Sequence, residues 1–332
     1  MSELYPLKFE PLLKEKIWGG DVLIRKYGKK APVGSKIGES WELSAVSDNL
    51  SVVSNGFLAG NNIEELIEVY MGDLTGEAVF DKFGNEFPLL IKFIEAREDL
   101  SVQVHPSDEM AKERHNAYGK TEMWYILESS QPSYIYTGFR EPLTKEKFGK
   151  AIENKILPDL LNKEEAYPGD VFFTPAGRIH AIGAGTVLVE IQQTSDITYR
   201  VYDWERKNEK GESRELHTEL ALDAIDYNIA VNSRIRKEPS LNNVENLVNC
   251  EYFNTNIIHF KKPVSRDYYE NDSFVIYVCT EGRFSICWDS KAETVSKGET
   301  VLLPASLTNV TLKPEPEASV LEIYITNINE KY

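Results

Sequence analysis

Residues 168–180 read PGDVFFTPAGRIH, and this stretch decides the predicted fold. The apolar run Val171-Phe172-Phe173 stands between two turns that are rich in Gly and Pro. Such punctuation on both sides of a short β-rich run favours a single buried strand. The segment therefore predicts a turn, a strand and a second turn, and it ends on His180.

The same pattern returns near the C-terminus, at a constant offset of 129 residues. Residues 297–309 read KGETVLLPASLTN and keep the turns and the apolar run. Equivalent positions are Gly169 and Gly298, Pro175 and Pro304, Gly177 and Ser306, and His180 and Asn309. The sequence thus predicts a duplicated unit in which only the first copy keeps the histidine. A chance match over four loosely defined positions is the alternative.

The chain of 332 residues is long enough for two domains with cores of their own. Short β-rich runs at even spacing predict a small sandwich or barrel at the C-terminal end; they cover residues 252–260, 273–280, 283–288, 293–303 and 319–326. We expect a mainly β protein with an N-terminal catalytic domain (1–235) and a C-terminal domain without metal (236–332). The polar stretch 234–246 is interpreted as the linker.

Helical periodicity is confined to a few segments. Residues 61–71 repeat apolar side chains at helical spacing, with Asn61 or Asn62 as the N-cap. The charged segment 141–165 is predicted to be an inserted helical excursion, and residues 214–226 a further helix.

Composition excludes several classes of function. The net charge of −16 argues against general binding of nucleic acid. No run of about 18 apolar residues and no recognisable export signal occur, so we expect neither a membrane span nor secretion. The three cysteines lack CxxC spacing and favour a reducing cytoplasm. A bound metal would therefore be held by nitrogen and oxygen.

Four side chains are candidate metal ligands. In LSVQVHP (100–106), strand alternation places Gln103 and His105 on the face opposite two valines. Glu122 begins an apolar strand, where an acid is disfavoured unless it is paired or bound to metal. Together with His180 these donors suit zinc, although Fe(II), Mn(II) or Co(II) would accept the same set. His115 and His217 are interpreted as surface residues.

The spacing of Gly169, Pro175, Gly177 and His180 resembles the second signature of the cupin β-barrel. Over residues 5–226 the chain resembles the short bacterial form of the type I mannose-6-phosphate isomerases. The segments that carry this resemblance are KIWGG, GESWELS, FPLLIKFIEA, LSVQVHP, GKTEMWYIL, PGDVFFTPAGRIHAIGAG and VEIQQTSDITYRVYDW.

The resemblance implies two cupin-type jelly-roll barrels and one zinc ion per chain. It implies an aldose–ketose isomerase that interconverts mannose 6-phosphate and fructose 6-phosphate. The family's zinc ligands fall on Gln103, His105, Glu122 and His180, and its active-site arginine falls on Arg200. Longer members carry His-Lys-Pro-Glu where this chain has Gly119-Lys120-Thr121-Glu122, so a role for that histidine does not carry over.

The reaction needs further groups, and the residues suggest them. Lys120, next to a ligand, and Glu190, on a strand leading from the site, are the candidate proton carriers. Lys92 and Arg178 are the candidates for binding the phosphate. Lys92 alternatively snorkels or pairs within its apolar strand. The expected partner is a small sugar phosphate, and the chain is expected to be a monomer or weak homodimer.

Two alternatives stay open. Another metal cupin, such as an Fe(II) oxygenase or a cupin-type glucose-6-phosphate isomerase, would use a similar donor set. A non-catalytic sugar-binding bicupin would have lost its ligands in both copies of the repeat, whereas the first copy keeps them.

Overall fold

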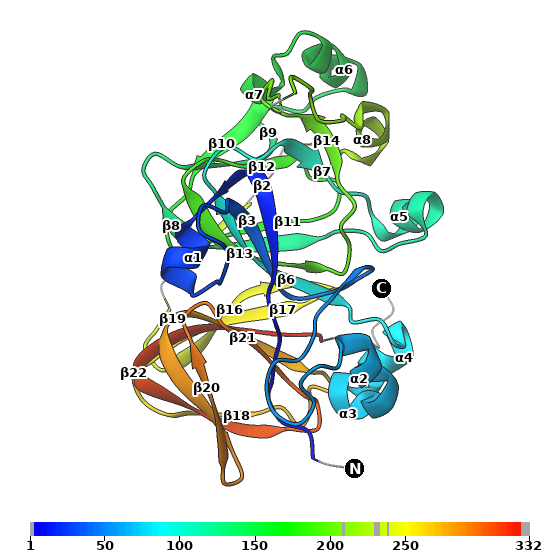
Figure 1. The fold of residues 1–332 in the computed structure, drawn as a ribbon. Helices are drawn as coiled ribbons and strands as arrows, with labels where there is room; N and C mark the ends of the chain where they lie inside the picture. Colours follow the sequence, from blue (N-terminus) through cyan, green and yellow to red (C-terminus); the bar gives the residue numbers. More distant parts are fainter. Residues whose placement is uncertain (1–2, 208–209, 229–232, 238, 327–332) are drawn as a thin grey trace.

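The computed structural model describes residues 3–207, 210–228, 233–237 and 239–326. It consists mainly of antiparallel β-sheet, as the sequence predicts. Two sheets occupy the upper part of the molecule in Figure 1, and a third sheet lies below them. A separate two-stranded ribbon joins β4 (Ala45–Val46) and β5 (Asn49–Leu50).

The central layer is a seven-stranded sheet. Its hydrogen-bonded order is β15 (Arg234–Arg236), β11 (Asp170–Thr174), β8 (Glu122–Ser129), β13 (Thr186–Gln193), β6 (Leu89–Ala96), β3 (Ile37–Leu43) and β2 (Leu12–Gly20). The predicted strand between two turns is β11, which lies next to the strand that opens with Glu122.

A five-stranded sheet packs on one face of the central layer. Its order is β10 (Leu161–Glu165), β9 (Tyr134–Phe139), β12 (His180–Ile182), β7 (Val102–Val104) and β14 (Tyr199–Tyr202). Both this sheet and the seven-stranded one end in edge strands, so neither closes into a barrel through hydrogen bonds. Two closed jelly-roll barrels therefore stay a prediction.

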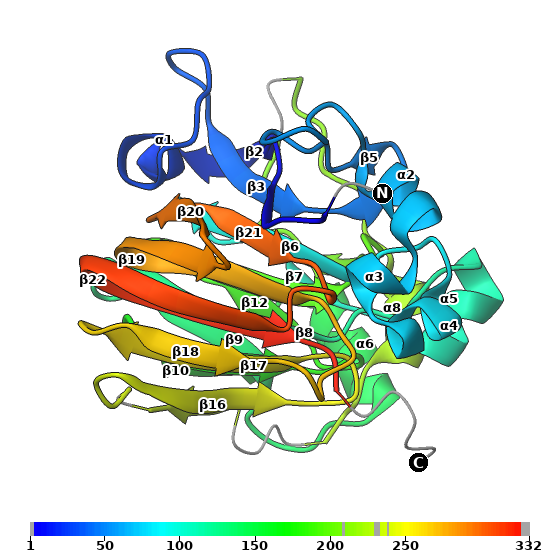
Figure 2. The ribbon, with the colours of Figure 1, turned by 90° about the horizontal axis from the view of Figure 1, so that it is seen from below.

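An eight-stranded sheet packs on the opposite face, in front in Figure 2. Its order is β1 (Leu7–Lys8), β21 (Thr300–Leu303), β19 (Val275–Trp288), β22 (Asn309–Tyr324), β17 (Asn254–Phe260) and β16 (Asn243–Asn249), with β18 (Val264–Asp267) on β22 and β20 (Lys291–Ser296) on β19. Since β1 pairs with β21, the first strand of the chain belongs to the sheet built from its last residues.

Alternation along each strand of the central sheet explains the layers. In β8, Trp124 and Ile126 belong to the apolar cluster shared with the five-stranded sheet. Met123, which lies between Glu122 and Trp124 in the sequence, belongs to the cluster shared with the eight-stranded sheet. Because neighbouring strand residues point to opposite faces, one strand supplies both cores.

The helices are short and lie at the outside (Figure 1). They are α1 (Val22–Tyr27), α2 (Ile63–Tyr70), α3 (Gly72–Thr75), α4 (Glu77–Phe83), α5 (Asp108–His115), α6 (Lys145–Glu153), α7 (Leu157–Leu160) and α8 (Thr218–Ala224). Phe148 of α6 and Ala221 of α8 pack with Val102 and Val104, so these helices cover the outer face of the five-stranded sheet. In the described residues, no helix is long and apolar enough to cross a membrane.

Several local predictions can be compared with this fold. Helix α2 begins after Asn62, which forms a capping box with Glu65, as expected for residues 61–71. The excursion 141–165 contains α6 and α7 but ends in strand β10. The linker interpretation of 234–246 was wrong, because β15 lies in this stretch, β16 begins in it, and both strands pair with neighbouring strands. Polar side chains on edge strands gave it the composition of a linker.

Strand register extends the repeat beyond the quoted stretch. Phe172 of β11 pairs with Trp124, and its equivalent in β21, Val301, pairs with Tyr277. Trp124 in turn pairs with Glu190, as Tyr277 pairs with Glu322. By the same register Lys92 corresponds to Asn256, and Glu122 to Val275. The two copies therefore share one framework of four adjacent strands.

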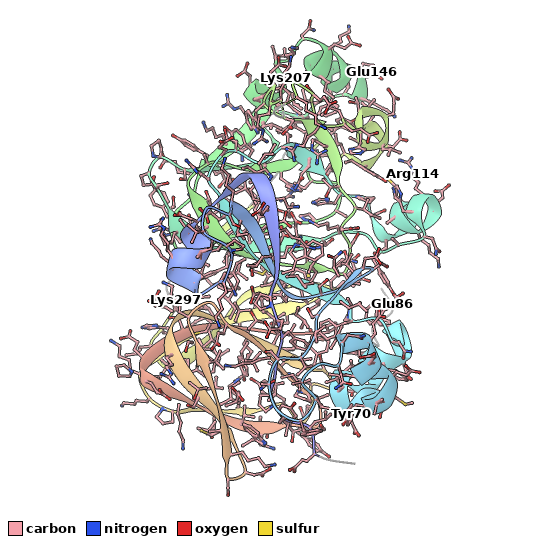
Figure 3. The ribbon with its side chains drawn as sticks, viewed as in Figure 1. Tyr70, Glu86, Arg114, Glu146, Lys207 and Lys297 are labelled. Atoms are coloured by element: carbon pink, nitrogen blue, oxygen red, sulfur yellow. The ribbon has the colours of Figure 1, made fainter. Side chains whose placement is uncertain are left out.

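A glycine of the second copy lies against helix α1. Gly298 has φ +85°, and a Cβ there would lie 2.4 Å from the carbonyl oxygen of Tyr27. Lys29 donates a hydrogen bond of 2.6 Å to the Gly298 carbonyl. The ammonium of Lys297, labelled in Figure 3, lies 5.0 Å from the centre of the Tyr27 ring. This contact joins residues from the two ends of the chain.

Gly298→Ala should destabilise the protein more than Gly169→Ala, measured as the shift in the urea midpoint of unfolding. Gly169 has φ +87°, and among the described residues no atom lies within 4 Å of a Cβ built there. In both variants the left-handed backbone at the new alanine lowers the free energy of unfolding by about 1 kcal/mol. Only Gly298→Ala adds a clash of about 1–3 kcal/mol. Equal shifts in the two variants would contradict this account.

Candidate metal centre and active site

The four predicted ligands meet between the five- and seven-stranded sheets. Gln103 lies in β7 and His105 directly follows that strand, while Glu122 and His180 begin β8 and β12. The side chains of His105, Glu122 and His180 are buried, with exposures of 0–1%. The alternation in LSVQVHP is confirmed, since Val102 and Val104 pack on the helical side of the sheet.

The donor atoms are close enough to share one ion. Nε2 of His105 lies 3.5 Å from Oε2 of Glu122, and Nε2 of His180 lies 3.3 Å from Oε1 of the same carboxylate. Two ligand atoms bound at about 2.1 Å to a tetrahedral zinc lie about 3.4 Å apart. The amide of Gln103 is 3.2 Å from His180 Nε2, and its two terminal atoms exchange places on a half-turn.

Backbone carbonyls fix the tautomer of both imidazoles. Nδ1 of His105 lies 2.9 Å from the carbonyl oxygen of Ile197, and Nδ1 of His180 lies 2.8 Å from that of Arg178. A carbonyl oxygen can only accept, so each Nδ1 carries the proton. Each Nε2 then presents its lone pair to the centre, the arrangement found in metal-ligating histidines.

Burial and charge keep the donors deprotonated. Burial lowers the pKa of His180 to about 3 and also lowers the pKa of His105. Burial tends to raise the pKa of Glu122, but the charge of Lys120 and the contacts with the imidazoles outweigh it and hold that pKa well below its usual range. Oε1 of Glu122 is buried and has no hydrogen-bond partner among the described residues. These features fit a divalent cation.

A cavity of about 410 Å³ opens beside this centre. Six basic and three acidic side chains line it, so its wall is positively charged although the protein carries −16. The basic residues are Lys14, Lys16, Lys92, Lys120, Arg200 and Arg214. Gln103, Trp18 and Trp41 are also part of the lining.

Arg200 lines this cavity from β14. Its Nε lies 3.3 Å from the hydroxyl of Ser101, and its Nη1 donates to the carbonyl of Glu215 at 3.0 Å. Both acceptors are neutral, so the charge of the guanidinium is available to a ligand. Burial lowers its pKa, with the charge of nearby Arg214 as a further cause.

Lys120 and Glu190 both lie in the cavity, but their surroundings differ. Nζ of Lys120 is 3.0 Å from His105 Nε2 and also bonds to Glu122. Glu190 accepts from Lys92 at 2.8 Å through one carboxylate oxygen and from Trp124 at 3.0 Å through the other. Lys92 also donates to Gln192, so it is the paired lysine that its apolar strand suggested.

Arg178 lies outside the lining of this cavity. Its guanidinium donates to the carbonyl of Phe173, and burial lowers its pKa while the charge of Asp226 acts in the opposite direction. Sequence reasoning placed it near the site because it stands within a few residues of a strand that carries a predicted ligand. Arg178 stands directly after the turn at Ala176 and Gly177 and before strand β12, so strand alternation does not fix the direction of its side chain.

Three cations of the cavity wall were missed. Lys14 and Lys16 lie in β2, and Arg214 lies beyond β14. The signal available was the alternation of Lys14, Lys16 and Trp18 on one face of a strand. His217, expected on a helix surface, lies just before α8, and its Nδ1 accepts from the backbone N–H of Arg200 at 3.2 Å.

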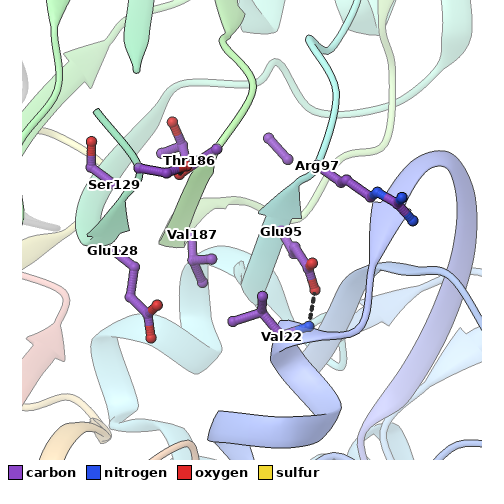
Figure 4. A pocket seen from close by; sticks show the side chains of 10 residues that line it. Val22, Glu95, Arg97, Glu128, Ser129, Thr186 and Val187 are labelled. Carbon is purple, nitrogen blue, oxygen red and sulfur yellow. Dashed lines mark hydrogen bonds between the residues drawn. The ribbon is translucent and has the colours of Figure 1, made fainter. Parts of the chain in front are cut away.

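Two further cavities lie elsewhere. Figure 4 shows one of about 360 Å³ in which the carboxylate of Glu95 accepts from the backbone N–H of Val22 at 2.7 Å. Its lining includes none of the four predicted ligands. The other, of about 760 Å³, shares Asp196 with the lining of the cavity of about 410 Å³.

The buried imidazoles predict a pH-dependent stability of the metal-free protein. The pKa of His180 is lowered from 6.5 to about 3. Between these two pH values the imidazole is protonated in the unfolded chain but not in the folded chain. Stability is therefore complete above pH 6.5 and falls as the pH drops towards 3. Urea unfolding in a chelator should show a loss of about 2 kcal/mol from this histidine between pH 6.5 and 5. His180→Gln should not show this loss of about 2 kcal/mol. If its unfolding free energy depended on pH as steeply as that of the wild type, His180 would not be the group responsible.

Comparison with known proteins agrees with this geometry. Residues 6–140 match the family model "Phosphomannose isomerase type I, catalytic domain", and residues 243–322 match "Mannose-6-phosphate isomerase, cupin domain". The chain is similar to mannose-6-phosphate isomerase ManA of Bacillus subtilis, with 34% identity over 95% of this chain and 98% of that protein.

Other relatives support the same assignment. The probable mannose-6-phosphate isomerase GmuF of Bacillus subtilis is 41% identical over 67% of this chain and 68% of its own length. A crystal structure of the mannose 6-phosphate isomerase from Bacillus subtilis superposes with a TM-score of 0.84, at 31% identity over 97% of this chain and 100% of that one. The chain belongs to the type I phosphomannose isomerase family.

Proposed function

We propose that this protein is a zinc-dependent isomerase that interconverts mannose 6-phosphate and fructose 6-phosphate through a cis-enediol(ate). The observation that carries the proposal is the buried set of His105, Glu122 and His180, joined by the partly exposed Gln103, beside a basic cavity. Family membership supports the substrate, and the positive wall suits an anionic sugar.

The proposed ligands are the two Nε2 atoms, a Glu122 carboxylate oxygen and the Gln103 amide oxygen, with one ion per chain. Zinc bound there supplies Lewis-acid chemistry that stabilises negative charge on the sugar oxygens. The donors would also accept Fe(II), Mn(II) or Co(II), so zinc is the proposal and not a consequence of donor type.

Arg200 is proposed to stabilise the developing enediolate. Its guanidinium is permanently charged, and its present partners are a hydroxyl and a carbonyl, which it can give up or share. A preorganised cation that faces growing negative charge in a confined cavity lowers the barrier to reaction.

Lys120 is the better candidate for the proton transfer between C1 and C2. It lies among the ligands and lines the cavity. Both oxygens of Glu190 are taken up by Lys92 and Trp124, and the equivalent position in the copy without ligands is also a buried glutamate, Glu322. A carboxylate that recurs without the metal ligands fits a structural role.

The phosphate is proposed to bind at the cations of the cavity wall. Lys14 donates to the neutral side chain of Asn49, while Lys16 pairs with Glu39 and Arg214 pairs with Asp203. Lys92 contributes charge, but Glu190 and Gln192 occupy its ammonium. Arg178 is left out of the proposed binding site.

The remaining expectations stay proposals. They are a cytoplasmic location, a monomer or weak homodimer, and division into residues 1–235 and 236–332. A metal cupin of other specificity is the main alternative, and assays on mannose 6-phosphate and glucose 6-phosphate distinguish the two. A non-catalytic sugar-binding protein is disfavoured, because the donor set of the first copy is complete.

Removal of the metal should abolish activity. We expect metal analysis to find one zinc per chain and a strong chelator to lower turnover by at least about 100-fold, since the charge stabilisation of the ion is lost. Adding zinc back should restore the wild type but not His180→Ala, which lacks one ligand. If the chelator did not change the turnover of mannose 6-phosphate, the metal-dependent mechanism would be wrong.

Arg200→Ala should lower kcat by about 10²–10³ while zinc content stays at one per chain, because it removes charge needed mainly in the transition state. Arg140→Ala is the matched control, since the exposed Arg140 also donates to a backbone carbonyl (Leu161, 3.0 Å) but lies outside the cavity. Full turnover in zinc-loaded Arg200→Ala would show that the assignment is wrong.

A further inference from the structure

We propose that Tyr252, Asp108 and Gln193 form a positioning chain that connects the eight-stranded sheet with the active site. These three hydrogen-bonded side chains fix the backbone of residues 119–122, which include Lys120 and the proposed ligand Glu122. Their effect on catalysis rests on the proposed function, whereas their effect on the backbone does not.

Asp108 is the centre of this chain. It lies in the first turn of α5, and its Oδ1 accepts from the backbone N–H of Gly119 at 2.8 Å and from Nε2 of Gln193 at 2.9 Å. Its Oδ2 accepts from the hydroxyl of Tyr252 at 2.8 Å. One carboxylate therefore joins three segments that are far apart in the sequence.

Gln193 extends the connection to the other end of the segment. Its Oε1 accepts from the backbone N–H of Thr121 at 2.8 Å, and its own N–H donates to the Thr121 carbonyl at 3.2 Å. The side chain is buried at 5% exposure. Gly119 and Thr121 are thus held on both sides of Lys120.

Tyr252 brings the eight-stranded sheet into the chain. It stands in the turn between β16 and β17, where the backbone N–H of Cys250 donates to the carbonyl of Phe253 at 3.0 Å. Burial and the neighbouring Asp108 raise the pKa of Tyr252, so its hydroxyl stays protonated and donates. This donor holds the carboxylate in the orientation that serves Gly119 and Gln193.

The position of Lys120 depends on this support. Its Nζ lies 3.0 Å from His105 Nε2 and bonds to Glu122, so small backbone shifts change the geometry of the reacting centre. Asp108, Gln193 and Tyr252 all line the cavity of about 760 Å³, where water can compete for the same groups. Partners that orient ligands in this way typically contribute about 10–100-fold to activity or metal affinity.

Tyr252→Phe removes only the hydroxyl and tests the proposal. We expect kcat to fall about tenfold with KM within about twofold, measured well below the melting temperature. Tyr118→Phe is the matched control: Tyr118 lines the same cavity, but its hydroxyl bonds to Glu86, labelled in Figure 3. A merely structural hydroxyl would lower the melting temperature in both variants and leave kcat unchanged.

Hydrogen exchange of the metal-free protein gives a readout that needs neither zinc nor substrate. In Tyr252→Phe the amides of Gly119 and Thr121 should exchange at least about threefold faster than in wild type and in Tyr118→Phe, because their acceptors are no longer fixed. Unchanged exchange at these amides, or unchanged kcat in Tyr252→Phe, overturns the proposal.

The two proposals fail in different ways. If the wild type does not isomerise mannose 6-phosphate, the proposed function fails, and the exchange experiment alone decides the positioning chain. If the wild type is active, Asp108→Asn combined with Tyr252→Phe should cost about as much kcat as the larger single loss, because both act through one carboxylate. Multiplicative losses would contradict a shared path.

Discussion

The buried carboxylate of Glu122 is the constraint around which the catalytic half is built. It is fully enclosed between two sheets, and an uncompensated charge in such a place costs several kcal/mol. Compensation comes from the ammonium of Lys120 on the approach to its own strand, while the Nε2 lone pairs of His105 and His180 on the opposite sheet face the same carboxylate and suit a shared cation. The two sheets must therefore meet in one register, since a slip by one residue would turn Glu122 towards the apolar face.

The second copy of the repeat shows what the framework does without that constraint. Val275 occupies the position of Glu122, so no charge needs partners there. The buried glutamate of the neighbouring strand persists as Glu322, now paired with Arg266 at 2.7 Å and hydrogen-bonded to Asn256 at 2.8 Å. Each copy thus keeps one satisfied polar group in its core. That group is separable from the proposed metal ligands, because the second copy keeps the glutamate at a position where it lacks those ligands.

How much the sequence predicted depended on whether the signal was local. Alternation in residues 100–106 gave the correct face for Gln103 and His105, because strand geometry has a fixed period of two. The edge strands within 234–246 were missed, since their polar faces look like a linker. The cations of β2 and the contact between Tyr252 and Asp108 arise from tertiary packing between distant segments, and no local pattern specifies such contacts.

The protein is acidic as a whole, but the wall of its cavity of about 410 Å³ is basic, so the long-range and the short-range electrostatic effects on a ligand differ in sign. At physiological ionic strength charges are screened beyond about 8 Å, so a substrate inside the cavity is governed by the wall rather than by the net charge of −16. Within that distance Arg200 faces neutral acceptors, whereas Lys92 is neutralised by Glu190. Because some cations are paired with carboxylates and others are not, the available positive charge is unevenly distributed over the cavity wall. The charge of Arg200 is available to an anionic substrate, whereas the charge of Lys92 stabilises the buried Glu190.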